Sequence, residues 1–250
     1  MNTTYESAVR QYLLQHQFDQ LVLKAVLFDM DGVLFDSMPN HARSWAQVCT
    51  RFGLDMTPED AYLHEGRTGA STINILTQRQ WGRNATEEEI AKIYEEKCHL
   101  FNACPEAEKM KGAEPLLHKI KAEQLGLFVV TGSGQKSLLD RLDEGFPGIF
   151  NRTHIVSSRD VKHGKPHPEP YLLGLSRAQV HPYEAIVVEN APLGVQAAAA
   201  ANIFTIAVNT GPLNPKVLEE AGANLVFPSM QALCDVWDDL YSTLKKQTIS

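Results

Sequence analysis

The sequence contains few cysteines and no pattern that would pair them. Its four cysteines, in a chain of 250 residues, show neither a CxxC pair nor the spacing of a zinc site. We therefore expect free thiols in the reducing cytoplasm. The chain also lacks an apolar run near the roughly 18 residues that a membrane span needs. Its first residues lack the basic-then-apolar pattern of a signal peptide, so we expect neither export nor a membrane partner.

Positive charge is also scarce. The chain carries 23 Lys and Arg against 30 Asp and Glu, which gives a formal net charge of -7. Because binding to a phosphate backbone rewards clustered cations, we expect no nucleic-acid partner. An acidic protein can still bind a small phosphate compound, provided that local groups hold it. The sequence does not show the oligomeric state, and we expect a monomer.

Short and nearly continuous apolar runs recur from residue 24 onward, and each ends in a polar or glycine-containing turn. Such runs are typical of strands buried on both faces of a parallel sheet. The predicted strands are residues 24–29, 126–131, 154–157, 185–189, 203–208 and 224–227. The predicted helices around them are residues 5–17, 135–144, 168–177, 192–201, 215–221 and 230–245. This alternation predicts an α/β fold with a doubly wound, Rossmann-like parallel sheet.

One long interval interrupts the alternation. Between the first two predicted strands, residues 37 to about 112 show hardly any strand signal. Helices are predicted there at residues 39–52, 58–64, 71–81 and 86–103. Thr86 and Glu89 have the spacing of a capping box at the start of the last one. We expect an inserted α-helical cap domain of residues 37–107, and a core domain formed by residues 1–36 and 108–250.

The polar residues at the strand ends carry the chemistry, because ligands of a doubly wound sheet bind beyond the carboxyl ends of its strands. Each residue alone is typical of a turn or a helix cap. Together they supply the groups that phosphoryl transfer requires. In chain order they are Asp29 and Asp31; Thr131, Gly132 and Ser133; Lys165; and Glu189 and Asn190.

These four segments, in this order, resemble the four motifs of the haloacid dehalogenase superfamily. The helical insertion resembles the mobile cap of its β-phosphoglucomutase-like members. The resemblance covers nearly all of residues 24–227 and implies an enzyme that transfers a phosphoryl group. It implies that Asp29 attacks phosphorus to form an aspartyl-phosphate, that Asp31 is the general acid and base, and that Lys165 neutralises the nucleophile and the phosphoryl group.

The resemblance also implies how the phosphoryl group and a metal are held. Thr131 would bind the phosphoryl oxygens together with the following groups at Gly132 and Ser133. Mg²⁺ is the implied cofactor, and it would offset charge on the phosphoryl oxygens. The implied metal ligands are Asp29, Asp31 through its carbonyl, Asn190 and, directly or through water, Glu189.

Two positions depart from the family pattern. Family members usually carry an acid where this chain has Asn190, so one negative charge is missing. In β-phosphoglucomutases a lysine precedes the cap-loop glycine, whereas this chain has Glu65 before Gly66. We hypothesise that on cap closure Glu65 supplies to the metal the carboxylate that Asn190 withholds. The alternative is a surface loop in which Glu65 pairs with Arg67.

These departures bear on the substrate. A metal ligand from the cap favours a compact, highly charged substrate. The cap loop is also similar to that of pyrophosphate-hydrolysing members of the family. Inorganic pyrophosphate is therefore the leading candidate for the substrate. Arg67 would anchor the distal phosphate. His41 favours the alternative of a β-phosphoglucomutase, because it stands where those enzymes carry a histidine that helps to transfer phosphate to a sugar. A second alternative, supported by Asn190 alone, is a non-catalytic relative that binds phosphate compounds.

Overall fold

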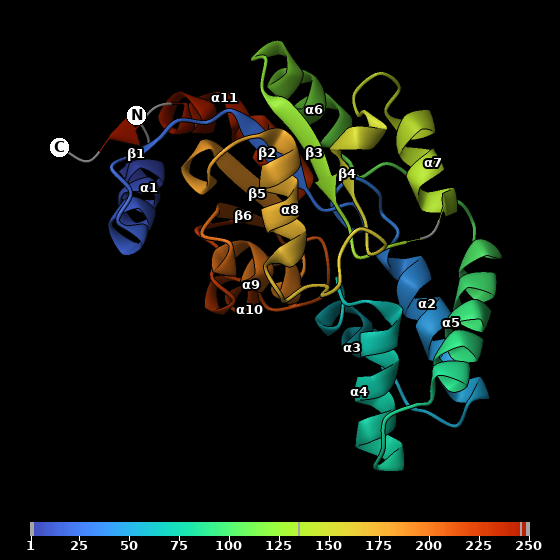
Figure 1. The fold of residues 1–250 in the computed structure, drawn as a ribbon. Helices are drawn as coiled ribbons and strands as arrows, with labels where there is room; N and C mark the ends of the chain where they lie inside the picture. The colour runs from blue at the N-terminus through green and yellow to red at the C-terminus, as the bar shows by residue number, and fades with distance from the viewer. Residues whose placement is uncertain (1–2, 135, 246, 249–250) are drawn as a thin grey trace.

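The computed structural model describes residues 3–134, 136–245 and 247–248. Its centre is a six-stranded sheet in the order β4-β3-β2-β5-β6-β7, and all of its strand pairs are parallel. The strands are β2 (Ala25–Phe28), β3 (Gly126–Val130), β4 (Ile155–Val156), β5 (Ala185–Glu189), β6 (Phe204–Val208) and β7 (Leu225–Phe227) (Figure 1). The predicted doubly wound α/β fold is confirmed.

The chain order reverses at β2. From β2 the chain continues to β3 and β4 on one side and later to β5, β6 and β7 on the other. In the register, Phe28 at the end of β2 pairs with Val129 of β3 and Val188 of β5. Because such a reversal opens a crevice beyond the strand ends, Asp29 and Asp31 follow β2 at the place where this fold binds ligands.

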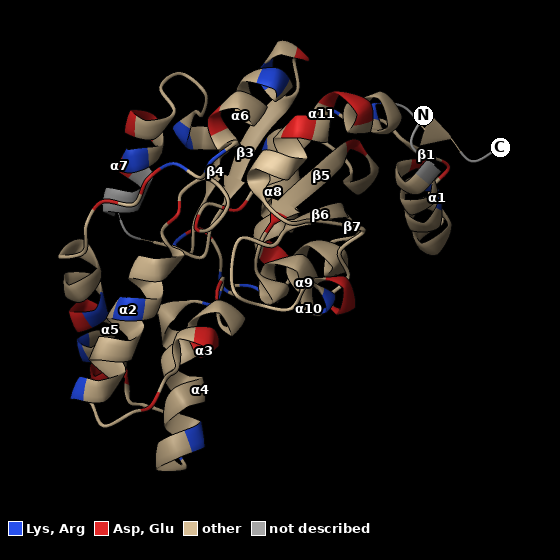
Figure 2. Cartoon of the chain, turned by 180° about the vertical axis from the view of Figure 1, so that it is seen from behind, with Lys and Arg blue, Asp and Glu red and all other residues tan. Residues whose placement is uncertain are grey.

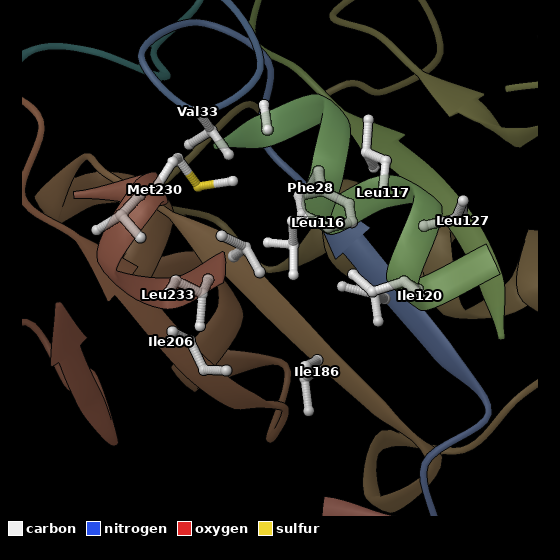
Figure 3. Close-up of a cluster of buried hydrophobic side chains, with 14 of the residues drawn as sticks. Phe28, Val33, Leu116, Leu117, Ile120, Leu127, Ile186, Ile206, Met230 and Leu233 are labelled. Atoms are coloured by element: carbon white, nitrogen blue, oxygen red, sulfur yellow. The ribbon is translucent and has the colours of Figure 1, made fainter. Parts of the chain in front are cut away.

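The two faces of the sheet bury different clusters of side chains. Along β2, Val26 and Phe28 face one cluster, whereas Ala25 and Leu27 face the other. The first face is covered by α1 (Thr3–His16), α6 (Ala113–Ala122), α7 (Lys136–Gly145) and α11 (Met230–Leu244). The second is covered by α8 (Glu169–Ala178) and α9 (Pro192–Ala200), with α10 (Pro215–Glu220) packed beside α9. Figure 3 shows strand residues of the first cluster among side chains of α6 and α11.

A separate group of helices lies beyond the carboxyl ends of the strands (Figure 1). These helices are α2 (Met38–Arg51), α3 (Pro58–Leu63), α4 (Gly69–Trp81) and α5 (Glu87–Asn102). They enclose their own apolar cluster, which includes Trp45, Ile73 and Ile93. The capping box of Thr86 and Glu89 is present at the start of α5. We call this group the cap and the remainder the core; the exact boundaries at residues 36/37 and 107/108 stay a prediction.

The two connections between the cap and the core run side by side. The backbone N–H of Asp36 donates to the carbonyl of Glu108 at 2.9 Å, and that of Met110 donates to Leu34 at 2.8 Å. A bridge between Phe35 and Lys109 joins them further. The paired connections hold the cap beside the end of β2.

The structure departs from the sequence prediction in two places. No helix was predicted at residues 113–122, where α6 lies. Pro115 occupies the first turn of α6, where its missing N–H costs no helical hydrogen bond. The two-stranded antiparallel pair of β1 (Gln20–Leu21) and β8 (Gln247–Thr248) was also not predicted. The expected start of α7 at Gln135 lies outside the described residues.

Short connecting elements complete the chain. Two 3₁₀ turns, η1 (Arg152–His154) and η2 (Pro182–Glu184), precede β4 and β5. In the view of Figure 2, Lys and Arg positions are scattered among Asp and Glu positions over both the core and the cap. Across the described ranges, no helix combines the length and apolarity that crossing a membrane requires.

Candidate active site

A buried lysine links two carboxylates at the end of the central strands. The Nζ atom of Lys165 lies 2.6 Å from Oδ1 of Asp29 and 2.5 Å from Oε1 of Glu189, and all three side chains are buried. Burial raises the pKa of Asp29 to about 7, against the opposing charge of Lys165. Burial alone would lower the pKa of Lys165, but the two carboxylates raise it, so its ammonium stays charged.

Both oxygens of Glu189 are committed to donors. Oε1 also accepts the hydroxyl of Tyr171 at 2.9 Å, while Oε2 accepts the backbone N–H groups of Asn190 at 2.9 Å and Ala191 at 3.0 Å. The carboxylate fits there because residue 194 is glycine; a Cβ at Gly194 would lie 1.6 Å from Oε1. This arrangement suits Glu189 to hold Lys165 in place, and it leaves little capacity for the metal role expected from the sequence.

The second aspartate is surrounded by donors. Oδ1 of Asp31 accepts the hydroxyl of Ser37 at 2.5 Å, and Oδ2 accepts that of Ser133 at 3.2 Å. Nε2 of His41 lies 3.2 Å from Oδ1. Burial raises the pKa of Asp31, but His41 and Ser37 outweigh it and lower the value to about 2. Thr131 takes part indirectly, since its Oγ1 accepts the backbone N–H of Ser133 at 3.0 Å.

A lysine of the cap lies behind His41. The Nζ atom of Lys97 is 2.9 Å from Nδ1 of His41 and packs over the ring of Phe101, 4.7 Å from its centroid. Because an ammonium can only donate, Nδ1 accepts, and the proton of the neutral imidazole is then on Nε2, which faces Asp31. Burial lowers the pKa of Lys97 to about 8. Burial and the charge of Lys97 also lower the pKa of His41.

The cap loop brings Glu65 to Asn190. Nδ2 of Asn190 lies 3.2 Å from Oε1 and 3.1 Å from Oε2 of Glu65. Burial raises the pKa of Glu65 well above its usual range, and the nearby carboxylates of Asp29 and Glu189 raise it further. No ion pair joins Glu65 to Arg67 in the part of the chain that the structure describes, so the alternative of a surface pair was wrong.

Two glycines let the cap loop lie on the core. Gly66 has a φ of +85°, which favours glycine, and a Cβ there would lie 2.9 Å from Cδ of Lys165. A Cβ at Gly132 would lie 2.7 Å from the carbonyl oxygen of Gly66. This close approach seats the loop that carries Glu65 directly over the pair of Lys165 and Asp29.

A small cavity of about 60 Å³ lies between the core and the cap, with room for a few water molecules. We call the residues that line it from the core the core wall, and those that line it from the cap the cap wall. Among the residues that the structure describes, several buried polar atoms at or beside the cavity have no hydrogen-bond partner. They are Nδ1 of His64, Nε of Arg67 and Oδ1 of Asn190. Because buried polar groups are normally paired, these atoms suit a polar ligand in the cavity.

The structure brings the residues expected from the sequence to one place. Those that line the cavity are Asp29, Asp31, His41, Glu65, Arg67, Gly132 and Ser133. Lys165, Glu189 and Asn190 lie directly behind Asp29 and Glu65, and Thr131 lies behind Ser133.

Four further residues of the site were not assigned a role from the sequence: Ser37, His64, Lys97 and Tyr171. Lys97 could have been found, because Ile93, Lys97 and Phe101 are four residues apart and share one buried face of α5. A lysine in an apolar stripe is exceptional. The contacts of the other three depend on the tertiary structure.

A family profile described as "Haloacid dehalogenase-like hydrolase" matches residues 26–208, which is most of the chain. The chain belongs to this family. The match spans β2 to β6, and so includes every residue of the cavity walls described above. The chain is thus an enzyme of the haloacid dehalogenase-like hydrolase family, as the sequence motifs indicated.

Several known proteins are similar to this chain. A structure described as a candidate β-phosphoglucomutase from Bacteroides vulgatus is 57% identical, with a TM-score of 0.95, and the match covers 98% of this chain and 100% of that one. The phosphorylated carbohydrates phosphatase of Thermotoga maritima is 32% identical over 80% of this chain and 92% of its own length. Hexitol phosphatase A of Escherichia coli is 32% identical over 84% and 93%.

Proposed function

We propose that this chain is a Mg²⁺-dependent phosphohydrolase that acts through an aspartyl-phosphate at Asp29, with inorganic pyrophosphate as its substrate. The observation that carries the proposal is the contact between Glu65 of the cap and Asn190 of the core, at 3.1 Å and 3.2 Å. It supports the hypothesis that a carboxylate absent from the core is replaced from the cap.

The donor set suits a magnesium ion at this contact. Oδ1 of Asn190 is buried without a partner among the described residues, and the Glu65 carboxylate lies against the same amide. Among the described residues, no group of three His, Cys, Asp or Glu side chains is arranged to hold a metal, so the side chains would supply only part of its coordination. Mg²⁺ suits such a site, because it usually combines one or two carboxylates with water and substrate phosphate oxygens. Asp29, the Asp31 carbonyl, Asn190 and Glu65 would hold the ion, which would neutralise charge on the phosphoryl oxygens.

The groups of the chain itself account for two displacements. In the first, a carboxylate oxygen of Asp29 bonds to phosphorus as the bond to the leaving orthophosphate breaks. Lys165 stays charged beside Asp29 and offsets the negative charge that gathers there. In the second, Asp31 takes a proton from water, whose oxygen bonds to phosphorus and releases Asp29 and a second orthophosphate.

The arrangement around Asp31 favours an acidic leaving group. Hydrogen bonds from Ser37 and Ser133 reach both carboxylate oxygens and stabilise the ionised form. An ionised Asp31 suits the base step. Orthophosphate departs without needing a full proton, whereas a sugar alkoxide needs one. The cavity of about 60 Å³ also matches a compact substrate better than a hexose.

A β-phosphoglucomutase remains the second proposal, and the contact of His41 with Asp31 and Lys97 favours it. A histidine next to the general acid and base suits proton transfer to and from a sugar hydroxyl. The 57% identity to a candidate β-phosphoglucomutase supports the same proposal. The two named phosphatases among the relatives make hydrolysis of a sugar phosphate a further possibility to test.

A turnover panel with Mg²⁺ separates these activities. The substrates are pyrophosphate, hexose and hexitol phosphates, and β-glucose 1-phosphate with and without its bisphosphate activator; the products are orthophosphate and glucose 6-phosphate. We expect the largest kcat/KM for pyrophosphate, and loss of turnover when EDTA removes the metal. Isomerisation of the sugar phosphate without release of phosphate from pyrophosphate would overturn the ranking.

A further inference from the structure

The cap wall of the cavity carries two buried nitrogen atoms that the reaction described above does not use. They are Nδ1 of His64 and Nε of Arg67, and neither has a hydrogen-bond partner among the described residues. Both side chains line the cavity. A buried polar atom without a partner costs about 1–3 kcal/mol, which a ligand that pairs with it would recover.

The local backbone holds the two side chains in one turn. His64 is the C-cap of α3, and its N–H donates to the carbonyl of Asp60 at 2.9 Å. The carbonyl of His64 accepts the N–H of Arg67 at 3.3 Å. Gly66, inside this turn, packs on Lys165. The turn therefore fixes His64 and Arg67 relative to the core wall.

The charges around the turn indicate an anionic ligand. No carboxylate lies within ion-pair distance of Arg67 in the described part of the chain, although its side chain is half-buried. Burial lowers the pKa of His64, and the Arg67 charge lowers it further, so the imidazole is neutral near neutral pH. A neutral imidazole can still donate one hydrogen bond beside the guanidinium.

The opposite wall carries the nucleophile. Asp29 and Ser133 line the core side of the same cavity of about 60 Å³. A pyrophosphate with one phosphorus at Asp29 therefore extends its second phosphoryl group toward the cap wall. There, His64 and Arg67 line the cavity, and each has a buried nitrogen without a partner among the described residues.

We propose that His64 is a specificity-determining residue that, together with Arg67, binds the phosphoryl group that is not transferred. This inference rests on the proposed function and deepens it, because it names the part of the protein that distinguishes a diphosphate from a monophosphate. His64 does not take part in the bond changes. Its hydrogen bond forms with the substrate and persists in the transition state, so it contributes to binding of both.

The test compares three substitutions at His64 on two small substrates. Acetyl phosphate is the matched substrate, because it offers a transferable phosphoryl group without a second one. In H64A we expect kcat/KM for pyrophosphate to fall roughly 10–100-fold, mainly through KM, since one charge-assisted hydrogen bond is lost. Turnover of acetyl phosphate should stay within about twofold. H64N, whose amide nitrogen can replace Nδ1, should recover part of the loss, and H64Q should not.

Two controls separate binding from folding. H118A removes an exposed histidine of α6 and should leave both substrates unaffected. Thermal unfolding shows whether H64A remains folded. If H64A does not remain folded, H64N repeats the test with a side chain closer in volume to histidine. An equal loss on both substrates, or no loss on pyrophosphate, would overturn the assignment of His64.

Binding of a non-hydrolysable diphosphonate distinguishes failure of this inference from failure of the proposed function. In calorimetry with Mg²⁺, methylenediphosphonate should bind wild type more tightly than methylphosphonate, and H64A should remove most of that difference. If wild type binds the diphosphonate in this way but does not hydrolyse pyrophosphate, the proposed function fails and the His64 site stands. If wild type hydrolyses pyrophosphate and H64A binds the diphosphonate unchanged, only the His64 site fails.

Discussion

The core and the cap each bury a lysine at the cavity, in opposite surroundings. Lys165 of the core contacts the carboxylates of Asp29 and Glu189 at 2.6 Å and 2.5 Å. Lys97 of the cap contacts the imidazole of His41 and the ring of Phe101. Burial alone would lower the pKa of both ammonium groups; the carboxylates reverse this for Lys165, whereas Lys97 falls to about 8. The core lysine is stabilised by its surroundings, and the cap lysine is not.

The same contrast holds for the neighbouring polar groups. In the core, Glu189 has donors on both oxygens and Asp31 accepts from two hydroxyls. On the cap side, His64 and Arg67 each retain a buried atom without a partner among the described residues. Apart from Oδ1 of Asn190, these core groups are paired without a substrate, so we propose that the core side of the cavity is organised before the substrate arrives and that the cap side is completed by it. This difference is what an enzyme needs if its chemistry is fixed and its specificity comes from the cap.

The largest expected effect comes from Asp29, the proposed nucleophile. D29N should reduce turnover of every phosphate substrate by about 10⁴-fold, because the amide cannot form the acyl-phosphate bond. The fold should persist, since Lys165 keeps Glu189 as a partner. Rapid-quench trapping of a phosphorylated protein checks this; it should detect the intermediate in wild type and not in D29N. An unchanged rate in D29N would exclude Asp29 as the nucleophile, and no turnover in wild type would favour the non-catalytic relative.

A smaller effect is expected from the residue that supports the core lysine. Y171F removes the hydroxyl that donates to Oε1 of Glu189 and retains the ring 5.1 Å from Nζ of Lys165. We expect kcat to fall about tenfold with little change in KM, since about 1.4 kcal/mol of alignment is lost and no substrate contact changes. The effect should be the same on pyrophosphate and acetyl phosphate. A change confined to KM would contradict a supporting role for Tyr171.

The smallest effect concerns stability and the cap lysine. K97M should stabilise the fold near pH 7 by roughly 1–3 kcal/mol, because it removes a buried charge that has no carboxylate partner. In wild type, the pKa of Lys97 is about 8 in the fold and 10.5 when unfolded, so the unfolded state binds more protons in this window and wild-type stability rises with pH there.

Thermal unfolding of the two proteins at several pH values measures this effect. The advantage of K97M should be full below about pH 8 and should disappear toward about pH 10.5. L76M is a matched control of the cap interior, where a volume-conserving change should show no such dependence on pH. A K97M protein less stable than wild type near pH 7 would contradict the contrast between the two lysines.

The sequence allowed more of the core wall to be predicted than of the cap wall. Asp29, Lys165 and Asn190 follow buried strands or their turns, and parallel strands carry such residues to one edge of the sheet. Glu65 was predicted to lie near Asn190 only because, compared with the family pattern, one acid is missing at residue 190 and one is gained at residue 65. The structure has the two side chains in contact. Their catalytic and metal-binding roles stay predictions.

The residues that were not predicted depend on contacts between distant segments. Lys97 reaches His41 only because α5 packs on α2, and Tyr171 reaches Glu189 only because α8 covers β5 and its neighbours. The helix α6 was also not predicted, although Pro115 lies in its first turn, where proline is compatible with a helix. A residue pattern does not show the contacts between distant segments without the tertiary structure.

The most direct test of the central claim is the initial rate of pyrophosphate hydrolysis by E65Q, measured as a function of Mg²⁺ concentration. Glutamine keeps the size of the side chain and removes the carboxyl group that lies against Asn190. We predict a fall in kcat/KM of roughly 100-fold and a weaker apparent affinity for Mg²⁺, with partial recovery of both in the double variant E65Q/N190D. Wild-type rates with an unchanged Mg²⁺ dependence in E65Q would contradict the account.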